Sequence, residues 1–363
     1  MRKVQIFHSF DGLPTEWITY FNKASHTSVF YSLPWFKNYA RTVLGVNDEV
    51  RIYAVNKMEK AIALLPLQVK SGLPGLSAPR MLQGLGNYYS SLFGPILGGN
   101  DSEVMLEELI SAISKERPRW DIIDLHPLDH EAATFNQLLQ AFKREGLWVA
   151  PYYCFGNWYL EINGRSYQDY FQSLPSRLKN TLRRKKKQLD ACGNAHIEIL
   201  TDGENLNKAI SDYVTIYNIR WKQVEPYPNF IPGLIHTCAE QGWLRLGVAY
   251  VSGQPAAVQI WIVHSGTAVI YKLAHNKQFD KLSIGSILTA TLMKYVIDVD
   301  KVTVIDYLTG DEAYKKDWMS HRRERWGIVA YNPYTPYGLL AAMFHFGGNK
   351  LKSLVHPISR SRR

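Results

Sequence analysis

The stretch that decides the fold runs from Trp243 to Trp318. Residues 267–299 read TAVIYKLAHNKQFDKLSIGSILTATLMKYVIDV, and residues 304–318 read VIDYLTGDEAYKKDW. Turn residues separate the first two β-rich runs and predict a hairpin, and a helical spacing of apolar residues follows the third run. The β-rich runs are residues 244–251, 256–263 and 267–274, and the helical segment is 287–299. The stretch therefore predicts a hairpin, a third strand, a helix and a last strand.

The start of that helix, residues 283–286, has the sequence Ser-Ile-Gly-Ser, and Ser283 is suited to cap it. The first N–H groups of a helix have no intrahelical acceptor, the helix dipole favours negative charge there, and glycine lets a ligand approach the backbone. The segment therefore fits a phosphate site. A helix cap with a small residue for packing explains the same residues equally well, and both interpretations stay open at this point.

Length and composition indicate a folded protein of one to three domains, because the chain has 363 residues of which 46% are hydrophobic. No run reaches the roughly 18 apolar residues of a membrane span, and the N-terminus lacks the apolar segment of a cleaved signal. Cys154, Cys192 and Cys238 are far apart, which favours reduced thiols in a cytoplasmic setting and no zinc motif. The net charge of +10 supports an anionic partner: a nucleotide cofactor, nucleic acid or an anionic membrane surface.

Two halves of the chain share an order of elements. The earlier half has a hairpin, a helix and a strand with Ile123-Asp124-Leu125, and the later half has a hairpin, a strand, a helix and a strand with Ile305-Asp306-Tyr307. The halves therefore resemble degenerate copies of one α/β unit. We expect an N-terminal domain at residues 1–165, a C-terminal domain at 166–335 and a basic tail at 336–363.

Basic residues are concentrated in residues 176–189, SRLKNTLRRKKKQL, and in the tail. In the first segment Leu178, Leu182 and Leu189 mark one face of a helix, and the crowded cations gain if an anion lies against them. A solvated basic face is the alternative. The tail joins an apolar helix to a basic end, which suits an anionic membrane surface, and packing onto the domain is the alternative. The tail residues concerned are Leu339, Leu340, Met343, Phe344, Lys350, Lys352, Arg360, Arg362 and Arg363.

Another helix, predicted at residues 206–224, carries aromatic and basic residues on one face. These residues are Tyr213, Tyr217, Arg220 and Trp221. A core face with a snorkelling arginine and a face directed at substrate are the two interpretations.

These residues resemble a known family. YKLAHNKQFDKLSIGSILTATLMKYVIDV followed by VIDYLTGDEAYKKDW is similar to the acetyltransferase-like domain of the CelD/BioF2-like family, which belongs to the GNAT superfamily and is related to the FemAB peptidyltransferases. The basic segment, FYSLPWFKNYARTVLG at residues 30–45 and the loop from Tyr88 to Pro95 resemble the same family, so the likeness covers roughly residues 25 to 335. It implies an α/β (α+β) protein of two tandem GNAT-like domains, each a mixed, mostly antiparallel sheet flanked by helices.

The resemblance also implies acyl transfer from acyl-CoA, which needs a donor cradle, an acceptor held in line, a proton acceptor and donors for the developing oxyanion. We expect two groups of cofactor-binding residues. The backbone N–H groups of Ser283, Ile284, Gly285 and Ser286, with the side chains of Arg183 and Arg184, are candidates for phosphate contact. The strand residues Tyr271, Lys272, Leu273 and Ala274 are candidates for lining the acyl-pantetheine arm.

Four residues of the pattern D-Y-L-x-G-D-x-x-Y-K at 306–315 are candidates for catalysis. Asp306 is the first candidate for general base and Asp311 the second, and a structural acid paired with Arg or Lys is the alternative for each. Tyr314 is a candidate for protonating the leaving thiolate, or it is a core residue. Lys315 would neutralise phosphate or acceptor charge, or it is a surface lysine. No metal is expected, because Pro127 spoils a helical pair of His126 and His130.

We therefore expect an acyl-CoA-dependent N- or O-acyltransferase acting by direct transfer on a sugar, amino-sugar or cell-envelope precursor, with acetyl-CoA or another acyl-CoA as co-substrate. The usual GNAT pyrophosphate signature has two small residues spaced as GxG or GxA, and here only Gly285 is present. An aminoacyl-tRNA-dependent FemAB-type peptidyltransferase and a non-catalytic GNAT-like binding module therefore stay open. The expected location is the cytoplasm, with peripheral contact at the inner face of the membrane as an extension of it. The oligomeric state is left open.

Overall fold

The structure of the protein is a computed structural model that describes residues 2–57, 60–70, 78–98, 102–221 and 225–355. The chain forms two compact units: unit 1 takes residues 1–40, 44–154 and 324–363, and unit 2 takes residues 41–43 and 155–323. The domain boundaries near residues 165 and 335 stay a prediction. Among the described residues, no helix combines the length and the apolar character needed to cross a membrane.

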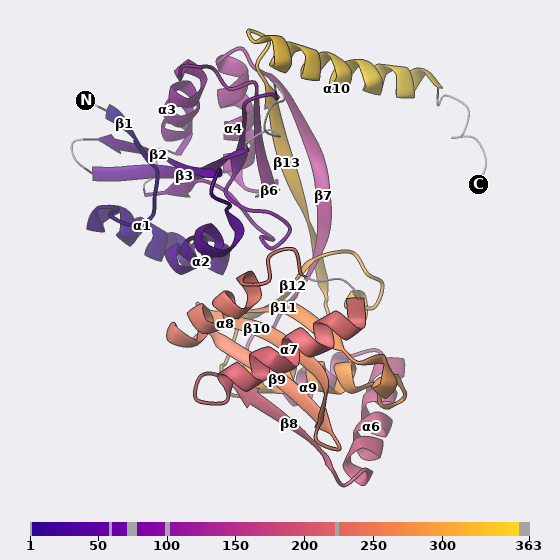
Figure 1. Cartoon of the computed structure of the whole chain (residues 1–363). Coiled ribbons are helices and arrows are strands. Elements are labelled where there is room, and N and C mark those ends of the chain that lie inside the picture. Colours follow the sequence, from indigo (N-terminus) through magenta and orange to yellow (C-terminus); the bar gives the residue numbers. More distant parts are fainter. Residues whose placement is uncertain (1, 58–59, 71–77, 99–101, 222–224, 356–363) are drawn as a thin grey trace. The chain divides into compact units, whose positions relative to one another are not determined.

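The elements of the chain follow in order (Figure 1). The first are β1 (Arg2–Phe7), α1 (Thr15–Ser25), η1 (Val29–Tyr31), α2 (Leu33–Val43), β2 (Glu49–Lys57), β3 (Lys60–Lys70), β4 (Met81–Gly84), β5 (Ile96–Leu97), α3 (Ser102–Lys115), β6 (Ile122–Asp129) and α4 (Ala133–Arg144). The next are β7 (Trp148–Glu161), α5 (Tyr167–Ser173), α6 (Ser176–Ala191), β8 (Ala195–Leu200), α7 (Leu206–Trp221), α8 (Phe230–Glu240), β9 (Leu244–Val251), β10 (Gln254–His264) and β11 (Thr267–His275). The last are η2 (Lys277–Leu282), α9 (Ile284–Asp298), β12 (Val304–Thr309), η3 (Lys315–Asp317), β13 (His321–Tyr331) and α10 (Pro336–Val355).

Each unit has its own mixed, mostly antiparallel sheet. In unit 1 the strand order is β1-β2-β3-β4-β6-β13, and in unit 2 it is β8-β9-β10-β11-β12-β7. In each of these two orders of described strands, only one neighbouring pair is parallel: β4 and β6 in unit 1, and β11 and β12 in unit 2. Strands β7 and β13 each contribute residues to both units. The fold class predicted from the sequence is thereby confirmed.

The two units repeat the same arrangement in detail. The parallel step joins residues 81–83 to residues 122–124 in unit 1, and residues 267–269 to residues 304–306 in unit 2. Asp124 and Asp306 therefore occupy the same register position in their sheets, each at the third residue of the parallel pairing. The Ile-Asp pair that suggested a duplication in the sequence marks equivalent points of two copies.

The strands and helices predicted around Trp243 to Trp318 form as expected. The hairpin is β9 and β10, the third strand is β11, the helix is α9 and the last strand is β12. Between β11 and α9 the chain makes the short 3-10 helix η2 where the sequence indicated only a polar loop. The basic segment forms α6, which is slightly longer than predicted.

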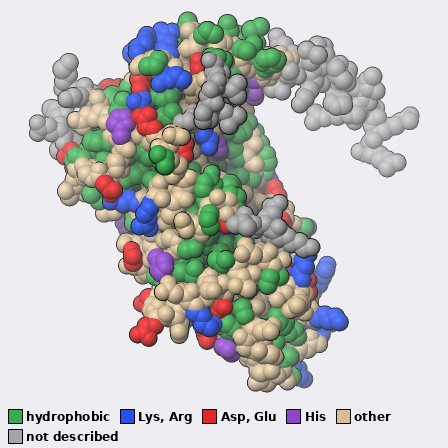
Figure 2. Space-filling view, in the orientation of Figure 1, with side chains coloured by type: hydrophobic (Ala, Val, Ile, Leu, Met, Phe, Trp, Pro, Cys, Tyr) green, Lys and Arg blue, Asp and Glu red, His purple; other side chains and the backbone are tan. Residues whose placement is uncertain are grey.

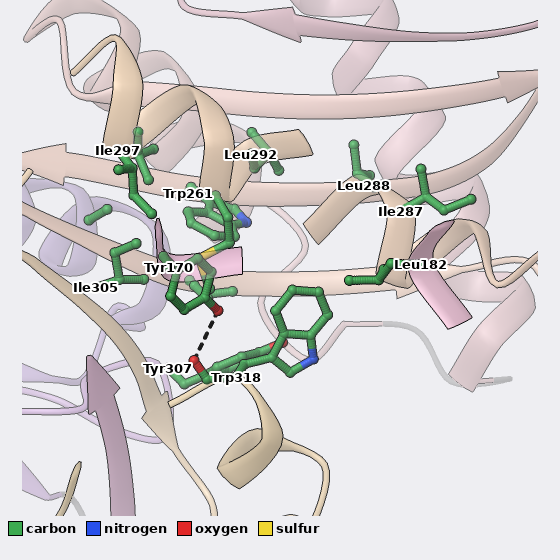
Figure 3. Close-up of a cluster of buried hydrophobic side chains, with 14 of the residues drawn as sticks. Tyr170, Leu182, Trp261, Ile287, Leu288, Leu292, Ile297, Ile305, Tyr307 and Trp318 are labelled. Carbon is green, nitrogen blue, oxygen red and sulfur yellow. Dashed lines mark hydrogen bonds between the residues drawn. The ribbon is translucent and has the colours of Figure 1, made fainter. Parts of the chain in front are cut away.

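The core of unit 2 lies between its sheet and the helices α6 and α9. Figure 3 shows Ile287, Leu288 and Leu292 of α9 among Trp261 of β10 and Leu182 of α6, and all five side chains are buried. Apolar residues at this spacing form a stripe along α9, and burying that stripe fixes the helix on the sheet. Elsewhere in the same core, the hydroxyl of Tyr170 donates to the Trp318 carbonyl oxygen at 3.0 Å.

The helices α7 and α9 cover opposite faces of this sheet. On β9, the Tyr250 hydroxyl donates to Asp212 of α7 at 2.6 Å, whereas Ala249 and Val251 belong to the core that contains α9. Successive side chains of a strand point to opposite faces. In Figure 1, α7 accordingly lies in front of the strands of unit 2.

Candidate active site

Strands β11 and β12 diverge soon after they meet. They pair only through residues 267–269 and 304–306, although β11 continues to His275 and β12 to Thr309. Tyr271 is the extra residue of a bulge in β11, because Ile260 pairs with Lys272 while the next residue, Trp261, pairs with Ile270. A bulge bends its strand and increases the local twist. The two strands therefore part beyond Val269, and the role of Tyr271, Lys272, Leu273 and Ala274 in lining an acyl-pantetheine arm stays a prediction.

Helix α9 begins beside the end of β11. Ser283 is its N-cap residue, as predicted, but it adopts the left-handed conformation with φ of 51° and its side chain makes no capping hydrogen bond. The first intrahelical bond runs from the Ile287 N–H to the Ser283 carbonyl oxygen at 3.1 Å. The N–H groups of Ile284, Gly285 and Ser286 precede that bond, so no carbonyl of the helix can accept them.

A buried glutamine fixes the first turn of α9 on the sheet. The Gln259 amide nitrogen on β10 donates to the Gly285 carbonyl oxygen at 2.9 Å and to the Thr289 hydroxyl at 2.8 Å. The indole N–H of Trp261 in turn donates to the Gln259 amide oxygen at 3.0 Å. Gln259 was not predicted from the sequence. There it stands out only as the single amide side chain in the apolar run AAVQIWIV. Its contacts make it a positioning residue for the helix start.

Packing inside the protein does not require a glycine at position 285. Its backbone is not in the left-handed region, and an added Cβ would meet His275 Nδ1 at 3.7 Å, an ordinary contact distance. By contrast, a Cβ on Gly247 would come within 2.8 Å of Leu292. Internal crowding therefore does not explain the glycine at position 285, and its role in close approach of a ligand stays a prediction.

The basic helix α6 brings positive charge close to the start of α9. The Lys185 ammonium donates to the carbonyl oxygen of Lys281, which lies three residues before α9. Arg183 instead lies over the ring of Phe171 at 5.4 Å, and Arg184 is exposed to solvent. Lys185 is therefore the α6 cation that the structure places against the segment leading into α9, and phosphate contact by Arg183 and Arg184 stays a prediction.

Asp306 is held by a dense set of partners. Its Oδ1 accepts from the Asn157 amide at 2.6 Å and from the Leu308 N–H at 2.7 Å, and its Oδ2 forms an ion pair with Arg323. Both oxygens are therefore occupied, as in a structural ion pair. The contact with Leu308 also supports the left-handed conformation of that residue, whose φ is 55°. The general-base role of Asp306 stays a prediction.

Asp311 has a comparable partner but a more exposed position. The Arg322 guanidinium binds both its oxygens, at 2.9 Å and 2.6 Å, and the Trp158 indole N–H donates to it at 3.0 Å. Bidentate contacts of this kind orient a carboxylate firmly. Its role as the second candidate base also stays a prediction.

We expect Asp306→Asn to destabilise the protein more than Asp311→Asn. The first change removes the carboxylate partner of Arg323 in a buried setting, which we estimate to cost about 2 to 3 kcal/mol, whereas an exposed pair contributes roughly 1 kcal/mol or less. Urea unfolding of both variants measures the difference. Equal loss of stability in the two variants would contradict the structural role of Asp306, and a loss of turnover beyond the unfolded fraction would support its role as a base.

Lys315 is buried and Tyr314 is about half exposed, which is the reverse of what their residue types suggest. Lys315 is only 3% exposed, so it is not a surface lysine, and its ammonium donates to the carbonyl oxygens of Tyr307, Thr309 and Gly310. Tyr314 is about half exposed and packs its ring edge-on against Tyr307 at 5.8 Å. Partial burial raises the pKa of the Tyr314 hydroxyl, which keeps it protonated at neutral pH.

A polar group lies on the α7 face of β11 around Lys272 and Glu225. Lys272 Nζ is 3.3 Å from Glu225 Oε1 and 5.6 Å from the ring centroid of Tyr217. The Tyr213 ring is tilted against that of Tyr217, with their centroids 5.7 Å apart. Burial and the nearby Glu225 carboxylate raise the pKa of Tyr213, so its hydroxyl keeps its proton. Tyr213 and Tyr217 belong to the aromatic face noted in the sequence, whereas nothing in the local pattern singled out Glu225.

The Tyr213 hydroxyl is buried and, within the part of the chain that the structure describes, makes no hydrogen bond. Buried hydroxyls in native proteins are almost always paired, and an unpaired one costs about 1 to 3 kcal/mol. The hydroxyl lies close enough to the Glu225 carboxylate to feel its charge.

A bulged strand that parts from its parallel neighbour, beside a helix whose first N–H groups have no acceptor in the helix, fits the site that the resemblance implies. Residues 176–316 match the family model described as acetyltransferase (GNAT) domain, which confirms the resemblance seen in the sequence for this part of the chain. The GNAT family implies an acyl-CoA co-substrate. A comparison with curated proteins gave no match.

Solved structures show the same fold over most of the chain. FemX shares 14% identity at a TM-score of 0.65, and the match covers 93% of this chain and 100% of FemX. A tandem GNAT protein from the clavulanic acid biosynthesis pathway shares 9% identity at a TM-score of 0.55, covering 92% and 100%. The C-terminal domain of a putative lysylphosphatidylglycerol synthetase from Agrobacterium fabrum shares 10% identity at a TM-score of 0.50, covering 80% and 85%.

Proposed function

We propose that unit 2 transfers an acyl group from acyl-CoA to the amine or hydroxyl of a sugar, amino-sugar or cell-envelope precursor. The observation that carries the proposal is the divergence of β11 and β12 beside the open N–H groups of Ile284, Gly285 and Ser286. An anionic diphosphate suits those N–H groups, and a narrow thioester arm suits the place where the strands part. The ammonium of Lys185 adds favourable charge close to the same place.

In the proposed reaction the acceptor approaches from the α7 face of the sheet. The acceptor nitrogen or oxygen forms a bond to the acyl carbon, and the carbon–sulfur bond of the thioester breaks. The acceptor proton passes to the Glu225 carboxylate, and the leaving thiolate takes a proton from the Tyr314 hydroxyl. We assign the first proton to Glu225 because this carboxylate lies on the α7 face, beside Lys272 and near Tyr213, where the acceptor would approach.

Calorimetry with acetyl-CoA, a long-chain acyl-CoA and tRNA tests the donor. We expect saturable binding of an acyl-CoA and no comparable binding of tRNA at physiological salt. Binding of tRNA alone would replace the proposal by an aminoacyl-tRNA-dependent peptidyl transfer. Binding of neither donor would leave a GNAT-like binding module.

The second candidate, aminoacyl-tRNA as donor, is favoured by one observation. The face of α6 turned away from the core carries exposed cations, among them Arg184 and Lys187. An RNA backbone fits such a row of charges, and its binding would weaken steeply with salt. Repeating the tRNA titration at several salt concentrations, with Arg184→Gln beside the unchanged protein, separates such contact from weak background attraction.

The acceptor side is tested by Tyr213→Phe, which removes only the unpaired hydroxyl. Because that hydroxyl has no partner in the described protein, its loss should leave the melting temperature unchanged or raise it. Turnover with the acceptor should fall roughly tenfold if the hydroxyl binds it. Full activity in a stable variant would show that no ligand uses this group. A fall in both stability and turnover would show that the hydroxyl has a structural partner instead.

Glu225→Gln tests the proton acceptor. The amide preserves the size of the side chain but cannot take the proton, so we expect turnover to fall by roughly 100-fold with little change in acyl-CoA affinity. Unchanged turnover would favour Asp306 as the proton acceptor instead, and the turnover of Asp306→Asn would test that role.

A further inference from the structure

Helix α10 at the end of unit 1 has an inner face that packs on the sheet. Ala342 is fully buried in a cluster with Ala150 and Val329, and the ring of Phe346 lies 6.2 Å from that of Trp148. At the start of the helix, a Cβ on Gly338 would lie 2.3 Å from the Asn332 carbonyl oxygen, so the backbones touch there. The inner face is therefore a fitted contact, and α10 is held along unit 1 through its first half.

The opposite face of α10 is apolar as well. Leu340 is 52% exposed, Met343 58% and Phe344 73%, at the spacing of neighbours on one side of a helix. Figure 2 shows hydrophobic side chains gathered along this outer surface, with Lys and Arg side chains of unit 1 nearby. A surface helix of a water-soluble protein turns polar residues outward, so an apolar outer face needs a cover.

The charge of the tail indicates what kind of partner would cover the outer face of α10. Residues 336–363 contain five Lys and Arg and no Asp or Glu. A second copy of the chain carries the same excess of cations, and like charges repel. An anionic lipid surface offers both an apolar layer for Leu340, Met343 and Phe344 and negative headgroups for the cations. The residues after 355 lie outside those the structure describes, and only their charge, known from the sequence, supports the choice of a lipid surface.

We propose that α10 docks this protein on the surface of an anionic membrane. The helix lies along the lipid headgroups with Leu340, Met343 and Phe344 turned into them, while its inner face stays on unit 1. This inference is independent of the reaction catalysed by unit 2. It would also bring an acyltransferase to the place where envelope precursors carried on lipids are found.

Sedimentation with vesicles tests the proposal, using the full chain, phosphatidylcholine vesicles and vesicles with about 30% phosphatidylglycerol. We expect binding to the anionic vesicles only, weakened by raised salt. Phe344→Glu should reduce the bound fraction, as a partition coefficient, by roughly tenfold or more. Val46→Glu is the matched control, because Val46 is a fully exposed apolar residue of unit 1 outside α10, and it should change binding less than twofold.

Three results would overturn the proposal. The first is equal binding to both kinds of vesicle or to neither. The second is an equal loss of binding in Phe344→Glu and Val46→Glu. The third is a dimer, seen by analytical ultracentrifugation without lipid, that Phe344→Glu dissociates, since a second copy would then be the cover. Each readout is a binding measurement, so it is unaffected by failure of the proposed acyl transfer.

Discussion

Replacing Gly285 by aspartate is expected to weaken acyl-CoA binding severely while leaving the protein as stable as before. The added carboxylate would stand among the N–H groups proposed to bind the diphosphate. Two unit charges about 4 Å apart repel by roughly 4 kcal/mol at an effective dielectric constant of 20. Since each 1.4 kcal/mol is a factor of ten, the affinity should fall by at least about 100-fold. Calorimetric titration with acyl-CoA measures the change.

The stability of the same variant can be predicted separately. The backbone at Gly285 is outside the left-handed region, and the new Cβ meets nothing closer than His275 at 3.7 Å. A carboxylate in the first turn of a helix also interacts favourably with the helix dipole, by about 0.3 to 1 kcal/mol. The melting temperature should therefore stay the same or rise.

Gly285→Ala is the matched control for charge at this position. It adds the methyl group without the carboxylate, so it should weaken binding less than the aspartate does. If Gly285→Asp binds acyl-CoA within twofold of the unchanged protein, the diphosphate does not lie at this helix start and the proposed donor site is wrong. If binding falls only together with the melting temperature, the site is wrong as well.

Local patterns were enough to predict part of unit 2, although α5, β8 and α8 were not among the predicted elements. Alternating and helical spacings of apolar residues indicated β9, β10, β11 and α9, because those spacings reflect burial on one face or on both faces of an element. The duplication was visible in the order of elements and in the Ile-Asp pairs, and Asp124 and Asp306 do share a register position. These features depend on residues close together in the chain.

The features that shape the candidate site depend instead on distant residues. The bulge at Tyr271 appears only when β11 is aligned with β10, and the parting of the strands appears only when β11 is aligned with β12. Helix α8 and the hairpin of β9 and β10 separate Glu225 from Lys272 in the chain. No local spacing in the sequence could therefore have indicated that the two residues form an ion pair. Lysine is among the least buried residue types, and the burial of Lys315 therefore contradicts the ordinary expectation for its type.

Lys315→Met should destabilise the protein strongly, because the lysine holds together the loop that follows β12. Its ammonium donates to three main-chain carbonyl oxygens, pairs with Glu312 Oε2 at 2.8 Å and lies 5.3 Å from the Tyr307 ring centroid. Methionine has a similar length but donates no hydrogen bond. The carbonyl oxygens of Tyr307 and its neighbours would then lose their donor in a buried place, at a cost of roughly 3 kcal/mol.

Two neighbouring residues supply controls for Lys315→Met in the same urea unfolding experiment. Lys316 is exposed, so Lys316→Met should shift the unfolding free energy by less than about 0.5 kcal/mol. Glu312→Gln keeps the contacts between the ammonium and the carbonyl oxygens and removes only an exposed partner, so it should cost about 1 kcal/mol or less. A Lys315→Met protein that unfolds at the unchanged urea concentration but has lost turnover would contradict the structural role. It would support instead the prediction that Lys315 neutralises phosphate or acceptor charge, since a buried ammonium that contributes no stability is retained for its charge.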